Sequence, residues 1–207
     1  MTISTDTRKR GPHAERRRAT RQQILNSAME VVRTKSFQGA TVFEVAKHAN
    51  VTPGAVQHHF ASKADLMMEI VDEILRAGQD SLGDTALPRK APLLRAKAYV
   101  QKLWSTVYEP PRFLVAWSIY FACTTDTEAC ARLAERRADL AKVLHQGFVA
   151  QFPELAGARG IDSFIDLVFS ALRGIAIARL FGPQDDNCRA QLEQLAQTIR
   201  YRIERGG

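Results

Sequence analysis

The 207-residue sequence predicts an all-α protein, and three observations support this prediction. Apolar residues recur at helical spacing along most of the chain, as in Ile24, Leu25, Ala28, Met29 and Val32. Helix-start signals precede several of these periodic segments. No segment shows the strict alternation or the hairpin turns that are typical of strands. We therefore expect an N-terminal unit of three helices followed by a larger helical domain.

The N-terminal third begins with a segment of different character. Residues 1–13 are polar and basic and lack periodicity, as disordered segments do. The first helix is expected from about Ala14 to Lys35, and a glycine turn follows it. The expected domain limits are 1–13 for a disordered basic arm, 14–61 for the three-helix unit, 62–78 for a connecting helix and 79–207 for the second domain.

Local capping signals define the short helices of the first unit. Thr41 and Glu44 have the spacing of a capping box, in which each side chain accepts from the other residue's amide. Asn50 is suited to the left-handed conformation that ends a helix. Thr52 is a favourable N-cap before a proline, and SKAD at 62–65 supplies the next start. The predicted order is helix, tight turn, short helix, tight turn, long helix.

The rest of the chain also shows helical periodicity. The segment SLGDTALPRKAP has the composition of a loop, and EPP, TTD, PELAGARG and GPQDDN separate the later periodic segments. Helices are expected over about 91–108, 111–124, 127–151, 161–182 and 187–204.

The net charge of +7 is concentrated in the first third of the chain. Residues 1–63 contain 11 Lys and Arg but only 4 Asp and Glu, whereas residues 64–207 contain equal numbers of both signs. A basic module joined to a neutral one is typical of a protein whose first domain faces a polyanion.

Several protein classes are disfavoured by what the sequence lacks. The three cysteines have neither the spacing of zinc ligands nor the even number of a disulfide framework, so no metal site is expected. The richest apolar run, 113–123, is shorter than a membrane span, and no signal-peptide pattern is visible. No Ser/His/Asp set, carboxylate pair or phosphate loop indicates an enzyme. We expect a cytoplasmic, non-enzymatic protein without cofactor or membrane association.

The short helix that begins at Pro53 lacks the acidic first turn that most helices have. No Asp or Glu occurs between Glu44 and Asp65. A helix N-terminus without carboxylates suits an approaching phosphate group, because the helix dipole and the first amides attract anions. Two helices joined by a tight turn, the second short and basic, are typical of a helix-turn-helix unit, whose second helix enters the major groove of DNA.

A helical wheel of this segment separates an inward from an outward face. At about 100° per residue, the inward residues are Pro53, Val56 and Phe60, and the outward or flanking residues are Gly54, Ala55, Gln57, His58 and His59. Small outward residues let the backbone come close to DNA, alanine contacts a thymine methyl, and glutamine pairs with adenine. Taken alone, a short basic helix is more often a solvated surface than a DNA reader. The adjacent histidines point in different directions and cannot share one metal ion.

The segment FQGATVFEVAKHANVTPGAVQHHFASKADLMMEIVDEI, residues 37–74, strongly resembles the N-terminal DNA-binding domain of TetR-family transcriptional regulators. The resemblance covers roughly residues 16–75 in motif detail and the remainder in helical layout. It is carried by the collective spacing of Gly39, Thr41, Val45, Ala46, Ala49, Val51, Thr52, Gly54, His58, Phe60, Lys63 and Leu66.

The resemblance implies a role for each matching position. Thr41, Thr52 and Lys63 are implied to contact phosphates. The full DNA-binding surface expected is Thr41, Thr52, Pro53, Gly54, Ala55, Gln57, His58, His59 and Lys63. Two positions depart from the family pattern, which more often has tyrosine at Gln57 and glycine at Asn50. The first departure leaves open whether Gln57 reads a base or contacts a phosphate.

The resemblance also implies that the second domain binds a small effector and forms a homodimer, usually through the last two helices of each subunit. A nearly all-apolar segment at 161–181 suits a helix buried on more than one side. The expected interface residues are Phe169, Leu172, Ile175, Leu192, Leu195 and Ile199. The expected effector pocket, which could equally be plain core, is lined by Trp104, Tyr108, Phe113, Trp117, Tyr120, Phe121 and Phe148.

These features predict a ligand-responsive transcriptional regulator. We expect a homodimeric repressor that a small apolar or aromatic effector releases from a palindromic operator in double-stranded DNA. The alternatives are a nucleoid-associated DNA-binding protein of the same fold without an effector, a monomer, an all-α enzyme, and a redox switch based on Cys123.

Overall fold

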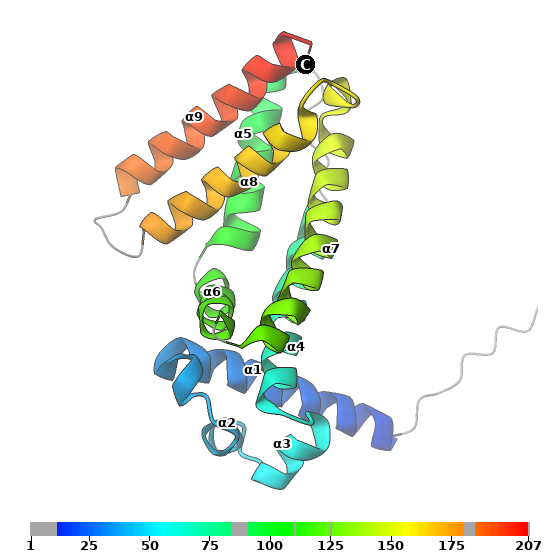
Figure 1. Cartoon of the computed structure of the whole chain (residues 1–207), viewed down its shortest axis with the longest axis vertical. Coiled ribbons are helices and arrows are strands. Elements are labelled where there is room, and N and C mark those ends of the chain that lie inside the picture. Colours follow the sequence, from blue (N-terminus) through cyan, green and yellow to red (C-terminus); the bar gives the residue numbers. More distant parts are fainter. Residues whose placement is uncertain (1–11, 84–90, 110, 125, 180–184, 207) are drawn as a thin grey trace, which may run out of the picture. The chain divides into compact units, whose positions relative to one another are not determined.

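The computed structural model describes residues 12–83, 91–109, 111–124, 126–179 and 185–206. Within these ranges the regular structure is entirely helical, which confirms the all-α fold (Figure 1). The chain divides into two compact units, residues 1–70 and 71–207. No helix in the described ranges is long and apolar enough to cross a membrane. Of the predicted arm, residues 1–11 lie outside the described part of the chain.

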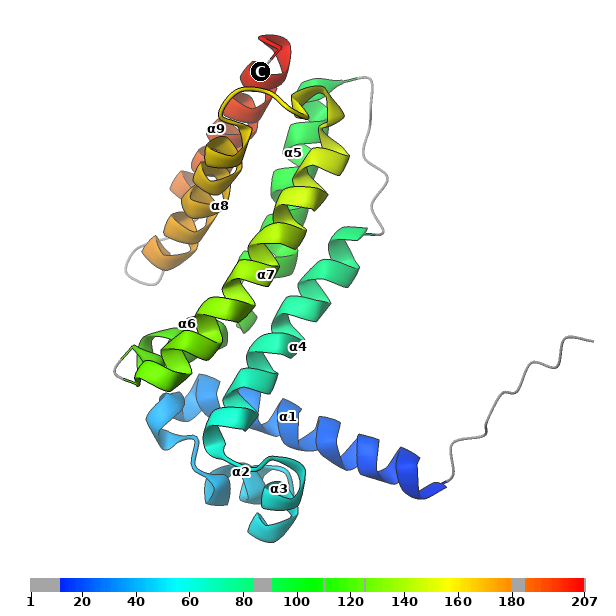
Figure 2. The same cartoon turned by 45° about the vertical axis from the view of Figure 1, so that its right-hand side comes forward.

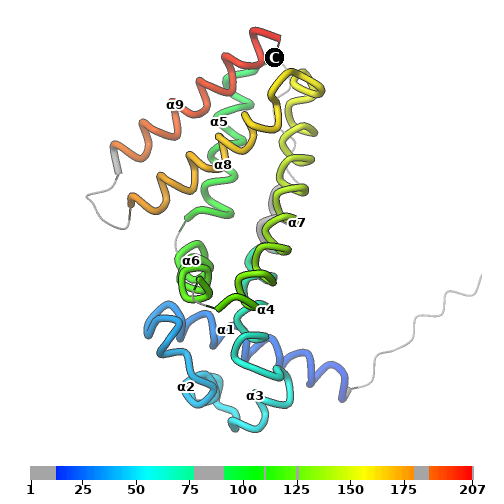
Figure 3. The backbone as a smooth tube through the Cα atoms, viewed as in Figure 1, coloured from blue at the N-terminus to red at the C-terminus, as the bar shows by residue number. Residues whose placement is uncertain are grey.

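The first unit contains α1 (Pro12–Gly39), α2 (Val42–His48), α3 (Pro53–His59) and the start of α4 (Lys63–Gly83). Figure 3 shows α2 and α3 as consecutive short helices joined by a tight turn. α1 begins two residues before the predicted start, since proline is well suited to a first helical turn. Its backbone leaves helical geometry at Ser36, next to the predicted end. The buried apolar residues of this unit include Ile24, Leu25, Ala28, Val45, Ala46, Val56, Phe60, Leu66, Met67 and Ile70.

The N-caps of α2 and α3 form as predicted, with one exception. The Glu44 amide donates to Thr41 Oγ1 at 3.2 Å, and the Ala55 amide donates to Thr52 Oγ1 at 3.1 Å. The Glu44 carboxylate, however, accepts from Lys35 Nζ at 2.5 Å, and the Thr41 amide donates to a backbone carbonyl. The reciprocal half of the predicted capping box is therefore wrong. A charge-assisted bond to an ammonium is stronger than a bond to a neutral amide.

The turn between α2 and α3 ends α2 through Asn50. Its φ of 52° places this residue in the left-handed region, as the sequence predicts. The Val51 amide donates to the Ala46 carbonyl at 3.0 Å, and the Asn50 amide donates to the Lys47 carbonyl at 3.3 Å. These two bonds form a Schellman motif, which satisfies the last carbonyls of α2.

The second unit is a layered arrangement of longer helices. It comprises the end of α4, α5 (Pro92–Leu103), a π-helical turn (Trp104–Tyr108), α6 (Arg112–Cys123), α7 (Thr127–Gln151), a 3₁₀ turn (Pro153–Leu155), α8 (Ile161–Ala178) and α9 (Asp185–Glu204). Figures 1 and 2 show α8 and α9 side by side, with α5 packed on α9. The predicted helix limits agree within a few residues, and residues 180–184 at the predicted end of α8 lie outside the described ranges.

A charged residue, Arg95, lies in the core of the second unit. The Arg95 side chain is buried, pairs with Glu154 of the 3₁₀ turn, and lies 5.2 Å from the centroid of the Phe152 ring. Partial burial alone would raise the pKa of Glu154, but the bond from Arg95 lowers it below its ordinary value. This pair joins α5 to the turn that precedes α8.

The left-handed residue of the inter-helix turn gives a stability prediction. Asn50→Ala should unfold about 1–2 kcal/mol more easily than Asn50→Gly, because a Cβ without a compensating polar group disfavours this conformation. Urea unfolding followed by circular dichroism measures the difference. Equal stability of the two variants would contradict a left-handed residue at this position.

Candidate nucleic-acid interface

Helix α3 exposes the side that the sequence predicts to face DNA. Gly54, Gln57 and His58 are exposed, whereas Val56 and Phe60 retain only 1% and 6% of their accessible surface. Two apolar residues four positions apart hold one side of the helix against the unit. The opposite side presents backbone, an amide and an imidazole, with no carboxylate.

Two details of the predicted helical wheel differ from the structure. Pro53 is exposed, so its predicted inward orientation is wrong. It stands at the first position of α3, three residues before the buried Val56. Ala55 is half-buried and therefore lies at the edge of the exposed face.

The start of α3 is open to close approach. A Cβ added to Gly54 would meet its nearest neighbour, Thr52 Oγ1, at 3.9 Å, which is an ordinary contact. The fold therefore does not require glycine at this position. The absence of a side chain instead leaves the backbone accessible, as close approach to a ligand demands.

The two histidines at the end of α3 lie in different environments. His58 is exposed, and His59 is half-buried with its ring centroid 5.5 Å from that of His58. Burial, and then the charges of His58, Arg17 and Arg21, lower the pKa of His59. Among the described residues, no cluster of three or more His, Cys, Asp and Glu side chains could hold a metal ion.

Helix α1 braces the helix-turn-helix from behind. Gln23 Nε2 donates to the Ala49 carbonyl at the end of α2, at 2.7 Å. Arg21 pairs with Glu69 of α4 at 3.0 Å, and its guanidinium carbon lies 4.9 Å from the centroid of the Phe60 ring. These contacts connect α1 to α2, to the end of α3 and to α4.

Lys63 is oriented toward its own chain. Its Nζ donates to the Phe37 carbonyl at 2.6 Å and to the Gln38 carbonyl at 3.3 Å. The same atom lies 4.4 Å from the centroid of the Phe37 ring. Burial lowers the pKa of Lys63. The ammonium is thus engaged by the last residues of α1, and both of these hydrogen bonds are directed at its own chain.

The structure shows an exposed apolar residue near Thr41 that the sequence analysis did not single out. Phe43 of α2 is 65% exposed, two positions after the exposed Thr41. The buried face of α2 contains Val45, Ala46 and Ala49. Helical spacing places Phe43 off that buried face, so the sequence alone already indicated that this side chain is exposed.

Most of the predicted pocket aromatics of the second unit lie in one chain of ring contacts. Successive centroids are 5.6 Å apart for Tyr108 and Phe113, 5.9 Å for Phe113 and Trp117, and 5.2 Å for Trp117 and Phe121. This aromatic chain consists of Trp104, Tyr108, Phe113, Trp117, Tyr120 and Phe121. Phe121 is 63% exposed and lies at its outer end. Phe148 packs elsewhere, with Tyr99, Phe152 and Phe164.

Polar groups within the aromatic chain are unevenly satisfied. The Tyr108 hydroxyl donates to the Phe169 carbonyl at 3.4 Å, and burial raises the pKa of Tyr108 to about 12. Trp117 Nε1 is buried and has no hydrogen-bond partner within the described part of the chain. A buried donor without a partner costs stability, so this indole is a candidate for binding an acceptor on a ligand.

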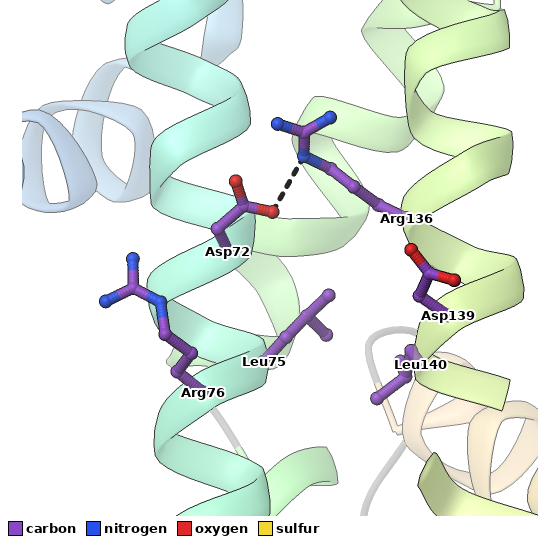
Figure 4. A pocket seen from close by; sticks show the side chains of 6 residues that line it. All are labelled: Asp72, Leu75, Arg76, Arg136, Asp139 and Leu140. Atoms are coloured by element: carbon purple, nitrogen blue, oxygen red, sulfur yellow. Dashed lines mark hydrogen bonds and ion pairs between the residues drawn. The ribbon is translucent and has the colours of Figure 1, made fainter. Parts of the chain in front are cut away.

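A charged pocket of about 260 Å³ lies between α4 and α7 in the second unit. Figure 4 shows Arg136 of α7 reaching toward Asp72 of α4, and the two atoms Arg136 Nε and Asp72 Oδ1 are 2.7 Å apart. The sequence reasoning missed this pocket, since only tertiary packing brings the two helices together. Its lining residues are Asp72, Leu75, Arg76, Arg136, Asp139 and Leu140.

The predicted dimer residues lie mainly inside the subunit. Phe169, Leu172, Leu192 and Ile199 are buried in the core of the second unit, so their side chains already pack within one subunit. Their place in a subunit interface stays a prediction. Ile175 and Leu195 are half-buried. Helical periodicity identifies an apolar face, but the same face serves equally well for packing within one chain.

The proposed redox role of Cys123 has little support from its environment. The side chain is buried, and burial, followed by the nearby Asp126 and Cys130, raises the pKa of its thiol. A raised pKa lowers the fraction of the reactive thiolate.

The chain is similar to known bacterial transcriptional regulators. Residues 24–70 match the family model for bacterial regulatory proteins of the tetR family. The chain is 22% identical to the HTH-type transcriptional regulator BetI of Brucella anthropi, over 88% of this chain and 93% of that protein.

Solved structures share the fold. A transcriptional regulator from Rhodococcus sp. Rha1 superposes with a TM-score of 0.70 at 20% identity, covering 86% of this chain and 95% of that one. A structure described as a transcriptional regulator from Saccharomonospora viridis in complex with choline has a TM-score of 0.63 at 14% identity, covering 90% and 96%. The matched segment contains α2, α3 and the start of α4, which carry the interface described above. The chain is a non-enzymatic DNA-binding regulator, and its matched segment, residues 24–70, belongs to the TetR family of bacterial regulatory proteins.

Proposed function

We propose that the chain is a homodimeric repressor, released from a palindromic operator by a small apolar or aromatic effector. The observation that carries the proposal is the exposed face of α3, which combines an open backbone at Gly54 with the polar side chains of Gln57 and His58. In this proposal residues 14–61 bind DNA, residues 62–78 connect, and residues 79–207 bind the effector and dimerise.

The proposed DNA contacts are of two kinds: phosphate contacts, which position the protein, and base contacts, which recognise the sequence. Thr41 and Thr52 are exposed N-caps of α2 and α3, and their hydroxyls lie where helix N-termini attract phosphates. Gln57 extends an amide from the exposed face, and an amide can make two hydrogen bonds to adenine. Phosphate contacts set the register, and base contacts set the sequence.

The effector is proposed to bind beside the aromatic chain of the second unit. Its ring contacts favour an apolar or aromatic molecule, and the buried Trp117 Nε1 favours one that carries a hydrogen-bond acceptor. A π-helical turn contains Trp104 and Tyr108, and such turns occur frequently at functional sites. The choline complex of the Saccharomonospora viridis regulator supports small-molecule binding by this fold.

The dimer is proposed to use the outer faces of α8 and α9. Leu167 on α8 and Tyr201 on α9 are 61% and 50% exposed, and large exposed apolar groups are typical of an association surface. Ala171 and Gly174 of α8 are small and not buried, which permits close helix packing. Phe169, Leu172, Leu192 and Ile199 lie in the core of the second unit and hold α8 and α9 in place within one subunit.

Operator binding should be dimeric and strongly dependent on salt. If about 6 to 10 phosphates are contacted per dimer, affinity should fall about 10³ to 10⁵-fold between 50 and 200 mM salt. Fluorescence anisotropy on duplexes selected from a random pool measures this slope, and the selected sequence should be a palindrome with half-sites about one helical turn apart. A salt-independent affinity, or a monomer on the operator, would contradict the proposal.

Gln57 should contribute to base reading. Gln57→Ala should cost about 1–3 kcal/mol on the selected operator and relax the preference at one base pair per half-site. Gln101→Ala, which removes an exposed glutamine from the second unit, is the matched control and should change neither quantity. A base-substitution scan decides the role: an even loss across all sites would assign Gln57 to a phosphate.

Trp117 should donate a hydrogen bond to the effector. Trp117→Phe retains an aromatic ring but loses the donor, so about tenfold more of an aromatic ester or ketone should be needed to release the operator. Tyr99→Phe, which removes a donor from a ring outside the aromatic chain, serves as the control. Operator release measured against a panel of such compounds tests the assignment, and an equal response of both variants would refute it. Failure of every compound to release the operator would favour a nucleoid-associated protein.

A further inference from the structure

We propose that Lys63 is a positioning residue that ties the start of α4 to the turn at residues 36–41, which contains the end of α1 and the link to α2, and thereby places Thr41 for DNA. The DNA part of this inference rests on the proposed function. It also assigns Lys63 a role other than the phosphate contact that the family resemblance implies.

The Lys63 ammonium is held by contacts within its own chain. Nζ is 2.6 Å from the Phe37 carbonyl oxygen and 3.3 Å from that of Gln38. It also lies 4.4 Å from the centroid of the Phe37 ring, within the range of a cation–π interaction. An ammonium has three donors, and two of them are directed at these carbonyls. The side chain is half-buried, so turning it toward DNA would break these contacts.

The turn to which Lys63 binds has an unfavourable backbone conformation. Ser36 has φ 67° and ψ 173°, a region that residues other than glycine rarely adopt and that costs about 1–3 kcal/mol. A Cβ added to Gly39 would come within 2.9 Å of the Lys35 Cβ, so the chain passes too closely for a side chain there. A turn of this kind persists only if its surroundings hold it, and the Lys63 bonds supply such a restraint.

The charge of Lys63 also suits this location. Phe37 and Gln38 lie at the end of α1, where the last carbonyl groups lack the i+4 amide partners of a continuing helix. The Phe37 carbonyl also accepts a weaker bond from the Ala40 amide at 3.3 Å. Positive charge at a helix C-terminus is stabilising because it complements the helix dipole. Lys63 therefore caps α1 from the first residue of α4.

The restraint continues to the predicted phosphate contact. The Thr41 amide donates to the Gly39 carbonyl at 2.8 Å, and the Thr41 hydroxyl caps α2. Lys35 Nζ and Glu44 Oε2, 2.5 Å apart, form an ion pair that spans the same turn. A displacement of the turn would therefore move the Thr41 hydroxyl together with the first turn of α2.

The test compares Lys63→Met with Lys47→Met. Methionine retains an apolar stem without donors, and Lys47 is an exposed lysine of α2 that serves as the matched control. Operator affinity is measured by anisotropy between 50 and 200 mM salt, at a temperature at which circular dichroism shows each variant to be folded. Amide hydrogen exchange of residues 37–41 is measured on the same DNA-free proteins.

For Lys63→Met we expect affinity to fall about tenfold at every salt concentration, with an unchanged slope of log affinity against log salt. The amides of residues 37–41 should exchange faster than in the original protein, whereas Lys47→Met should leave their exchange unchanged. If Lys63 instead bound a phosphate, its removal would lower the slope by about 0.9 for each phosphate that the protein no longer neutralises.

A reduced slope, an unchanged affinity or unchanged exchange in Lys63→Met would each overturn the inference. If Lys63→Met does not fold, Phe37→Leu removes the ring beneath the ammonium, and it should accelerate the same amides and weaken binding without changing the slope. If the original protein binds no duplex, the proposed function fails, and the exchange measurement by itself decides whether Lys63 holds the turn.

Discussion

A helix of seven residues is too short to be stable in water by itself, and the DNA-binding unit is organised around this constraint. α3 takes its shape from its surroundings. Thr52 caps its start, Val56 and Phe60 fasten one side, and the left-handed Asn50 sets the direction from which the chain enters. The exposed side of α3 can therefore consist of residues that contribute almost nothing to folding.

The parts of this unit that could be predicted from sequence are those encoded by neighbouring residues. The N-caps at Thr41 and Thr52 and the helix end at Asn50 depend on spacings of a few positions, and the structure confirms them. The parts that sequence could not supply depend on residues brought together from afar. Glu44 pairs with the ammonium of Lys35, and not with the Thr41 amide that local spacing predicts. Lys63 binds the carbonyls of residues 37 and 38, which the fold brings next to the start of α4.

The second unit shows the same limit on a larger scale. Apolar spacing correctly identified α8 and α9 as helices with strongly apolar faces, yet it could not say what covers those faces. Phe169 and Leu192 are covered by their own subunit. The pocket between α4 and α7 depends on packing between helices that are far apart in sequence, which periodicity does not report. The aromatic residues were easier to place, because most of them follow one another along a continuous stretch.

The open backbone at Gly54 has a consequence for how such a protein changes over generations. A side chain at this position would meet only an ordinary contact, and Gln57 and His58 are surface residues. Substitutions at surface positions usually alter stability by no more than about 0.5 kcal/mol. Mutation can thus explore new side chains on this face while the fold stays intact. Duplicated copies of the gene could acquire different target sites by a few substitutions, without first gaining stability elsewhere.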